Sequence, residues 1–201
     1  MWVYLIMINL ELKPYMQNVD KLRNLVRYQS APRVSSETVA EHSFFVAAYV
    51  LKLHDYYDFK LEKALSMAIL HDYAEAFISD VPSPIKQQFP NIAIALEDAE
   101  HKIISDHISK DFANYMDEFN DKLSAEGCMV ALADILSVVS YAKYEIGLGN
   151  SEYMKDVLRN AKNKINKLVA ISNKYIRTDI KAYVVECDNI YGFINNIPDN
   201  I

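Results

Sequence analysis

Glycine and proline are scarce in this chain of 201 residues, which has four of the first and six of the second. β-Sandwiches and barrels need a turn signal about every ten residues, so the scarcity argues against a hairpin-rich fold and favours long helices. Cysteine is scarcer still, with only Cys128 and Cys187. Two such distant cysteines exclude a disulfide framework and a cysteine zinc site, and they suit a reducing cytoplasm.

Positive charge is also in deficit, because 21 lysines and arginines face 27 aspartates and glutamates. The resulting net charge of -6 and pI near 5.4 oppose attraction to a polyphosphate or to an anionic bilayer. We therefore expect neither a nucleic acid polymer nor a membrane as partner. The length and the hydrophobic fraction of 51% predict a globular protein with a single domain over residues 1–201.

The N-terminal run from Met1 to Leu12 is apolar, but it is too short to span a bilayer and Pro14 follows it closely. It is compatible with a strand, a short buried helix or an oligomer contact. A packing role is the simplest interpretation.

After Pro14, apolar residues recur at helical spacing almost everywhere. The pattern predicts helices over Val19–Tyr28, Val39–Leu53, Leu61–Phe77, Ile92–His107, Phe112–Leu123, Ala125–Ile146, Tyr153–Ile176 and Ile180–Ile194. The expected N-caps are Thr38 in a capping box with Glu41, then Ser124, Asn150 or Ser151, and Asp179. The prolines of the segment 80–84 predict an extended turn. The fold class predicted is all-α.

Four ionisable side chains lie inside apolar helical stretches, where an unpaired charge is costly to bury. They are His42, His71, Asp72 and Asp134. Each alone is more often an ordinary core or capping residue. Together, two imidazoles and two carboxylates form the mixed nitrogen and oxygen set that binds a divalent transition metal with positions left open.

The surroundings of these residues refine the expectation. The helix around Asp134 is apolar on nearly every side, so its carboxylate is expected to point inward. Neighbours on a helix diverge by about 100°, so His71 and Asp72 have to straddle the ion. Glu75 lies four residues after His71, which places it either near the open side of the ion or on the solvent-exposed surface. Lys86 has two equal interpretations, a source of positive potential near the site or a surface lysine.

Five ordered motifs connect these residues to a known family. They are Arg27-Tyr28, Val39-Ala40-Glu41-His42-Ser43, His71-Asp72-Tyr73-Ala74-Glu75, Asp80-Val81-Pro82-Ser83-Pro84-Ile85-Lys86 and Ala133-Asp134. The sequence resembles the HD-domain metal-dependent phosphohydrolases and, more narrowly, the YfbR-like 5'-deoxynucleotidases, over about residues 22–144. The resemblance implies a helical HD-domain bundle with a central metal site, in which helices over 150–195 complete the core or an oligomer face.

The resemblance also implies a role for each matching residue. His42, His71, Asp72 and Asp134 are expected to bind one divalent metal ion, such as cobalt, manganese or another first-row metal. Glu75 is expected to transfer a proton and Arg27 to orient the phosphate, both as catalytic residues. The implied substrate contacts are Arg27, Tyr28, His42, Asp72, Asp80, Val81, Pro82, Ser83 and Asp134. Tyr28 stands where the family has tryptophan, so the preference for sugar and base stays open.

The implied function is removal of the 5'-phosphate from 2'-deoxynucleoside 5'-monophosphates, with a small nucleotide as partner and a cytoplasmic homodimer as the active form. One alternative is a triphosphohydrolase that acts on deoxynucleoside triphosphates. The other is a non-catalytic nucleotide sensor, and the presence of Glu75 beside the four metal-binding residues speaks against it.

Overall fold

A computed structural model describes residues 2–122 and 124–177 of the chain, with side chains from residue 12 onward. The helices are α1 (Trp2–Leu22), α2 (Val39–Leu53), α3 (Leu61–Leu70), α4 (Glu75–Ile78), α5 (Ser83–Gln88), α6 (Pro90–His107), α7 (Lys110–Asp121), α8 (Ala125–Gly147), α9 (Ser151–Ser172) and the 3-10 turn η1 (Asn173–Tyr175). Within these ranges no strand forms, so the all-α prediction is confirmed. The helix predicted over Ile180–Ile194, its cap Asp179 and Cys187 lie outside the described residues.

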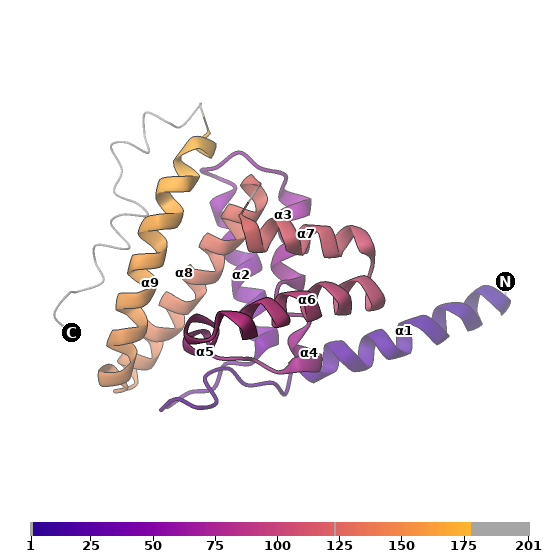
Figure 1. Cartoon of the computed structure of the whole chain (residues 1–201), viewed down its shortest axis with the longest axis horizontal. Coiled ribbons are helices and arrows are strands. Elements are labelled where there is room, and N and C mark those ends of the chain that lie inside the picture. The colour runs from indigo at the N-terminus through magenta and orange to yellow at the C-terminus, as the bar shows by residue number, and fades with distance from the viewer. Residues whose placement is uncertain (1, 123, 178–201) are drawn as a thin grey trace.

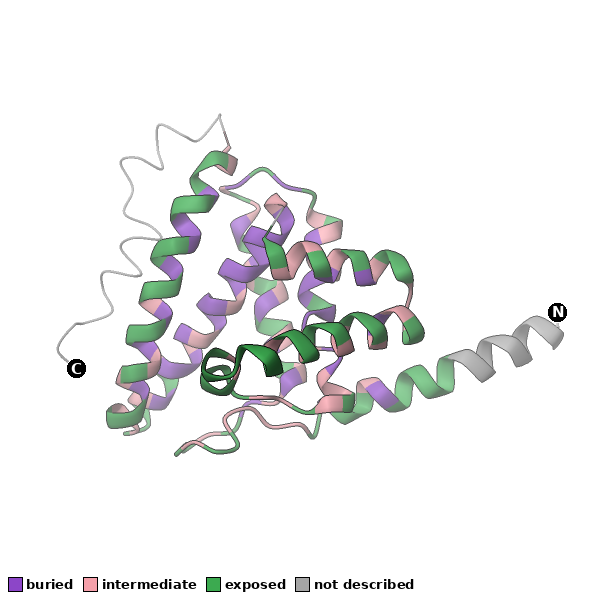
Figure 2. Cartoon of the chain, in the orientation of Figure 1, coloured by how far each residue is buried: buried purple, intermediate pink, exposed green. Residues whose placement is uncertain are grey.

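Helix α8 forms the centre of the bundle (Figure 1). Helix α9 runs antiparallel along one side of it, and α2 and α3 pack on another. Helix α7 contacts both α8 and α3, and α6 packs on α7. Buried residues concentrate on α8 and on the faces that α2, α3 and α9 turn toward it (Figure 2). Helix α8 is long and apolar enough to cross a membrane, but 78% of its most apolar stretch is buried, as in a core helix.

Helix α2 begins as predicted, with Thr38 as its N-cap. The Thr38 hydroxyl accepts a hydrogen bond from the backbone N–H of Glu41, and the Glu41 carboxylate accepts one from the backbone N–H of Thr38. This capping box fixes the first turn of the helix. The buried face of α2 consists of Val39, His42, Val46, Val50 and Leu53. His42 is therefore directed into the core by the helical period itself.

The prediction of a helix from Val19 to Tyr28 is wrong at its C-terminal end, because α1 ends at Leu22. The following segment pairs with the chain that enters α2. The backbone N–H of Arg27 donates to the carbonyl of Glu37 at 2.9 Å, and a bridge joins Val26 to Thr38. Tyr28 then adopts a left-handed conformation with φ of 56°, which is incompatible with a right-handed α-helix.

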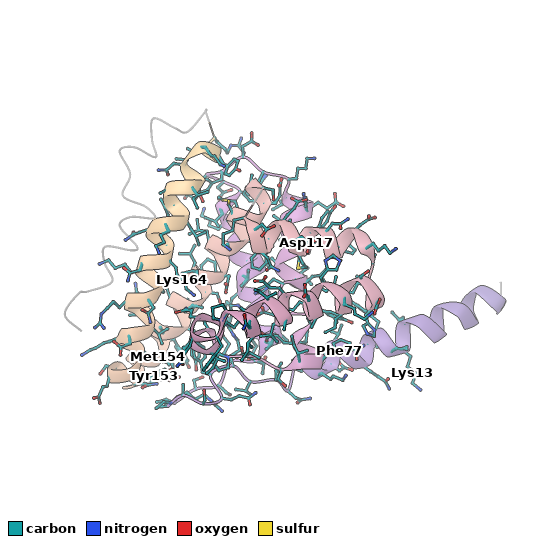
Figure 3. The ribbon with its side chains drawn as sticks, viewed as in Figure 1. Lys13, Phe77, Asp117, Tyr153, Met154 and Lys164 are labelled. Carbon is teal, nitrogen blue, oxygen red and sulfur yellow. The ribbon has the colours of Figure 1, made fainter. Side chains whose placement is uncertain are left out.

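Helix α1 continues through Pro14, so the strand alternative for the N-terminal run is wrong. Its N-terminal part extends away from the bundle (Figure 1). Its C-terminal part contacts α4 and the residues just before it. The Tyr15 ring stacks on Tyr73 with ring centres 6.0 Å apart, and the Lys21 ammonium lies 4.8 Å from the ring centre of Phe77 in α4. Figure 3 labels Phe77 at this junction.

The single helix predicted over Leu61–Phe77 is also wrong, since α3 ends at Leu70 and α4 begins at Glu75. Between them the hydrogen bonds tighten to three-residue spacing, from Tyr73 N–H to the carbonyl of Leu70 and from Glu75 N–H to that of Asp72. The His-Asp pair therefore occupies a break between two helices. Glu75 opens a new helix instead of lying one turn along the same one.

The remaining boundaries differ by a few residues. Helix α7 ends at Asp121, because Lys122 adopts a left-handed conformation. Helix α9 ends at Ser172 and gives way to the turn η1. The extended turn expected over 80–84 ends at Pro82, which is followed directly by α5. The Ser124 cap is confirmed, since its hydroxyl accepts from Gly127 N–H at 3.1 Å.

Candidate metal centre

Two buried imidazoles form the base of the site. The Nδ1 atom of His42 lies 3.1 Å from the hydroxyl of Ser137, and Nδ1 of His71 lies 2.9 Å from the carbonyl oxygen of Ala68. The Nε2 atoms of both rings are buried, and neither makes a hydrogen bond of good geometry within the described part of the chain. A ring whose Nδ1 is engaged in this way offers Nε2 as a metal ligand.

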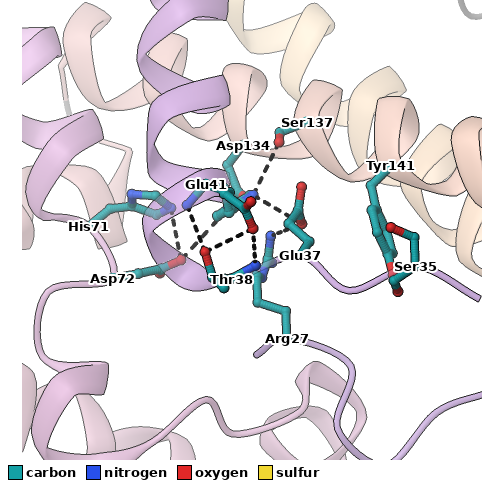
Figure 4. A network of polar contacts seen from close by, with 11 residues as sticks. Arg27, Ser35, Glu37, Thr38, Glu41, His71, Asp72, Asp134, Ser137 and Tyr141 are labelled. Atoms are coloured by element: carbon teal, nitrogen blue, oxygen red, sulfur yellow. Dashed lines mark hydrogen bonds and ion pairs between the residues drawn. The ribbon is translucent and has the colours of Figure 1, made fainter. Parts of the chain in front are cut away.

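Two carboxylates face these Nε2 atoms (Figure 4). Asp134 Oδ1 lies 3.1 Å from Nε2 of His42, and Asp72 Oδ2 lies 3.1 Å from Nε2 of His71 and 3.7 Å from that of His42. One ligand atom each from His42, His71 and Asp134 lies within 4.8 Å of the others. His42, His71 and Asp134 therefore form a candidate site for one divalent metal, and the Asp72 carboxylate lies beside it.

The local electrostatics keep the carboxylates ionised. Burial opposes it, but the neighbouring imidazoles outweigh burial and lower the pKa of both Asp72 and Asp134. Burial also lowers the pKa of His42, whereas at His71 the Asp72 carboxylate outweighs burial and raises the pKa to about 9. Two ionised carboxylates beside two imidazoles are the ligand chemistry that first-row divalent ions prefer.

Glu75 lies at the edge of this cluster. Its Oε2 atom is buried and has no hydrogen-bond partner among the described residues. Burial, and then the nearby charges of Asp72 and Asp80, raise the pKa of Glu75 to about 10. Glu75 is therefore a carboxyl group that can hold a proton beside two ionised carboxylates.

Arg27 brings positive charge to the same place. Its guanidinium is largely buried, and Nη1 lies 3.3 Å from Glu37 Oε2. Burial alone disfavours the cation, but Asp72 and other nearby groups, Asp134 among them, outweigh it and raise the pKa of Arg27. Arg27 thus stays charged and interacts electrostatically with Asp72 and Asp134.

Tyr28 and Asp80 form a neighbouring wall. Burial raises the pKa of Asp80 although the Arg27 guanidinium and the Tyr28 backbone act against it, and the Tyr28 ring stacks on Tyr141 with ring centres 5.0 Å apart. Ser79, just before Asp80, has a φ of 65°, an uncommon conformation for a residue other than glycine. Such strained backbone often accompanies a functional loop.

The rest of the predicted substrate loop lies further out. Val81 is half-buried, and Pro82 and Ser83 are exposed. Within the described residues, the contact of Ser83 with another part of the chain is with Lys164 of α9, 3.5 Å away. The structure therefore places Arg27, Tyr28, Glu75 and Asp80 within electrostatic range of Asp72 or Asp134. Among the described residues, no such interaction is seen for Val81, Pro82 or Ser83.

Three polar residues near the site were not predicted from the sequence. Ser137 follows Asp134 by three residues on one helical face, and this spacing was an available signal. Glu37 directly precedes the capping box, and no periodicity distinguishes it. Glu100 of α6 lies 3.8 Å from the Lys86 ammonium, in a helix that contains other acidic residues.

The family follows from comparison with known proteins. A family model described as 5'-deoxynucleotidase YfbR-like matches residues 14–184. The chain belongs to the YfbR-like 5'-deoxynucleotidase family. A 5'-deoxynucleotidase of Pasteurella multocida is 31% identical over 149 residues, which cover 67% of this chain and 75% of the relative.

Solved structures agree on the fold. A conserved hypothetical protein of Pyrococcus furiosus superposes with a TM-score of 0.69 at 26% identity, over 90% of this chain and 98% of its own. An HD-domain phosphohydrolase of Listeria innocua gives a TM-score of 0.67 at 21% identity, over 80% of this chain and 82% of its own. The predicted membership of the YfbR-like family and the predicted helical HD fold are confirmed.

Proposed function

We propose that this YfbR-like protein removes the 5'-phosphate from 2'-deoxynucleoside 5'-monophosphates and releases deoxynucleoside and inorganic phosphate. The observation that carries the proposal is the convergence of four side chains. Two buried imidazole Nε2 atoms, from His42 and His71, face the carboxylates of Asp72 and Asp134. The named activity of the Pasteurella multocida relative supports the substrate class.

These four residues would hold one divalent ion, which when bound supplies Lewis-acid polarisation of the phosphoryl group and acidifies water. Arg27 binds the phosphate oxygens through its guanidinium, whose two parallel N–H groups match a phosphate in geometry and charge. The guanidinium is largely buried and interacts electrostatically with Asp72 and Asp134, two of the residues that would hold the metal.

Glu75 is the residue that transfers a proton in the reaction. Water adds to phosphorus while the bond to the 5'-oxygen breaks, so one proton leaves the water and one reaches the 5'-oxygen. Glu75 Oε2, buried and without a hydrogen-bond partner in the described structure, is the atom placed to carry it. Because burial and the charges of Asp72 and Asp80 raise its pKa, the Glu75 carboxyl can hold a proton and donate it to the leaving 5'-oxygen.

Tyr28 forms the wall against which the sugar packs. Its ring is fixed by the stack on Tyr141, and the Arg27 guanidinium lies 5.7 Å from its centre. Arg27 and Tyr28 are adjacent in sequence, so phosphate and sugar contacts come from one short segment. Asp80 lies within electrostatic range of Arg27 and Asp72, and it would contact the nucleoside.

We also propose a cytoplasmic homodimer that uses manganese or cobalt. Mixed imidazole and carboxylate ligands suit these first-row ions without selecting sharply among them. Support for the dimer comes from α1, which extends away from the bundle with Leu12 and Met16 exposed. Contiguous exposed apolar side chains often mark a protein contact.

Incubation of the purified chain with deoxynucleoside and ribonucleoside monophosphates and with dATP, in Mn²⁺, Co²⁺ or Mg²⁺, tests the reaction. We expect inorganic phosphate from the deoxynucleoside monophosphates. Triphosphate from dATP in place of this product would establish the triphosphohydrolase alternative. Nucleotide binding without turnover under all three metals would establish the sensor.

A pair of variants tests the proton-transfer role. Glu75→Gln keeps the shape of the side chain and should lower kcat about 100-fold, the usual size of a general acid or base contribution. Glu62→Gln changes an exposed carboxylate on α3 and should leave kcat unchanged. Undiminished turnover by Glu75→Gln would show that the proton takes another route.

A further inference from the structure

Glu37 is a buried carboxylate next to Arg27, and the proposed reaction gives it no role. Glu37 is 6% exposed, although it lies in the short segment that enters α2, where most side chains face solvent or are half-buried. Its Oε2 atom lies 3.3 Å from the Arg27 guanidinium. The backbones of the same two residues are also joined, from Arg27 N–H to the Glu37 carbonyl at 2.9 Å. Glu37 therefore binds both the backbone and the guanidinium of Arg27.

The alternative partner of Glu37 is His42, and the distances exclude a hydrogen bond to it. Glu37 Oε2 lies 3.9 Å from His42 Nδ1, whereas the Ser137 hydroxyl lies 3.1 Å from that atom. Ser137 thus engages the back of the metal-binding ring, and the Glu37 carboxylate is left for Arg27 (Figure 4).

Charge alone makes Glu37 an unexpected neighbour of a phosphate site. A carboxylate this close repels a phosphate dianion, so its presence beside Arg27 weakens phosphate binding unless it does something else. An arginine side chain has many rotamers, and holding it in one of them lowers the entropy that is lost on binding. The geometry therefore points to orientation as the contribution of Glu37.

We propose that Glu37 is a positioning residue that holds the Arg27 guanidinium in the orientation that receives the substrate phosphate. The inference rests on the proposed phosphatase function. Because Arg27 contacts the phosphate before and during the reaction, loss of its orientation weakens substrate binding more than it slows the chemical step.

Two substitutions at Glu37 separate orientation from charge. Glu37→Gln keeps an oxygen that accepts from Arg27 and removes the negative charge, so we expect KM for a deoxynucleoside monophosphate to stay level or fall. Glu37→Ala removes both, and we expect KM to rise about tenfold with kcat within about threefold of the original. Inhibition by inorganic phosphate should weaken by the same factor as KM rises.

The matched control is Glu41→Gln, four residues further along the chain in the first turn of α2. Glutamine also completes a capping box, and Glu41 is exposed, so KM and kcat should not change. Metal content of each variant, measured by elemental analysis, should equal that of the original chain. Circular dichroism checks that each variant folds. If Glu37→Ala does not fold, the KM of Glu37→Gln is still measured.

A second measurement asks whether Glu37 acts through Arg27. In an Arg27→Ala background, Glu37→Ala should raise KM no further. An additive rise of KM in that background overturns the positioning role. A KM of Glu37→Ala equal to that of the original chain overturns it as well. In both cases, turnover by the original chain still supports the phosphatase. Absence of phosphate release from the original chain overturns the phosphatase itself, so the two failures are distinguishable.

Discussion

At the scale of single residues, the metal centre depends on how each imidazole is held from behind. His42 is fully buried, and the Ser137 hydroxyl at its Nδ1 fixes both the ring orientation and the nitrogen that faces the carboxylates. His71 is held by the Ala68 carbonyl of its own chain segment. One ring is thus oriented by a side chain that can be replaced, and the other by backbone.

This difference makes Ser137 a testable contributor to metal affinity. Ser137→Ala should weaken Mn²⁺ binding about 10-fold to 100-fold, the usual effect of removing a group that orients a metal-binding histidine. Competition with a fluorescent chelator measures the affinity. Ser140→Ala, three residues further along α8, is the matched control. Equal affinities for the two variants would show that packing alone orients His42.

The sequence allowed the metal set to be predicted because ionisable residues stand out in apolar helices. Asp134 interrupts a run of mostly aliphatic side chains, and His71 follows one directly. The contribution of Glu37 depends on the pairing of two loop segments ten residues apart. Neither helical periodicity nor residue type carries information about such a pairing.

At the scale of elements, the loop that carries Arg27 and Tyr28 is anchored to α8 by Glu145. This carboxylate is fully buried and accepts hydrogen bonds from the backbone N–H groups of Val34 and Ser35, at 2.8 and 2.6 Å. The Asn150 side chain donates a third at 2.8 Å. Burial opposes ionisation, but these donors outweigh it and lower the pKa of Glu145.

The lowered pKa of Glu145 predicts how the anchor responds to acid. A carboxyl group with a depressed pKa in the folded state stabilises the fold above its unfolded pKa of about 4.3, and the contribution is lost as the pH falls further. Glu145→Gln should lower the free energy of unfolding by about 3 kcal/mol at pH 7. Urea titrations at pH 7 and pH 3.5 should show a smaller loss on acidification for Glu145→Gln than for the original chain. Parallel losses would contradict the anchoring role.

The close crossing of α7 and α8 requires a glycine at position 127. A Cβ atom added at Gly127 would lie 2.5 Å from the backbone carbonyl oxygen of Glu118, so the two helices approach this closely only with glycine. Gly127→Ala should lower the free energy of unfolding by about 2 kcal/mol, as overpacking does. Gly147→Ala, with no atom within 4 Å, should be neutral or stabilising. Urea unfolding measures both, and equal effects would show that the crossing adjusts without cost.

The helix boundaries that the sequence did not predict are those that tertiary contacts decide. Apolar spacing continues from α3 through the break into α4, yet the chain turns where the His-Asp pair faces the site. It also continues past Leu22, yet Arg27 pairs with the backbone of Glu37 instead of extending α1. Caps set by adjacent residues, such as Thr38 and Ser124, were predicted correctly because their hydrogen bonds are local.

At the scale of the whole molecule, the proposed metal site joins segments that are distant in the chain. His42 comes from α2, His71 and Asp72 from the break after α3, and Asp134 from the middle of α8. An ion bound to all four links the helices that form the core. Unfolding separates these segments, so the unfolded chain has no equivalent site.

Metal binding should therefore raise the unfolding temperature of the folded chain. At a free metal concentration 100 times the dissociation constant, the added stability is about 2.7 kcal/mol. For a chain of this length, that corresponds to a Tm rise of about 5 to 10 °C. Differential scanning fluorimetry with Mn²⁺ and with excess chelator measures the shift.

Asp134→Asn supplies the control for this shift. It removes one charged ligand while keeping the side chain's size, so its Tm should change little between Mn²⁺ and chelator. The central position of Asp134 on α8 makes the comparison specific, because metal bound at surface carboxylates is unaffected by this substitution. An equal Tm rise in Asp134→Asn would locate the stabilising ion elsewhere and separate metal binding from the four-residue centre.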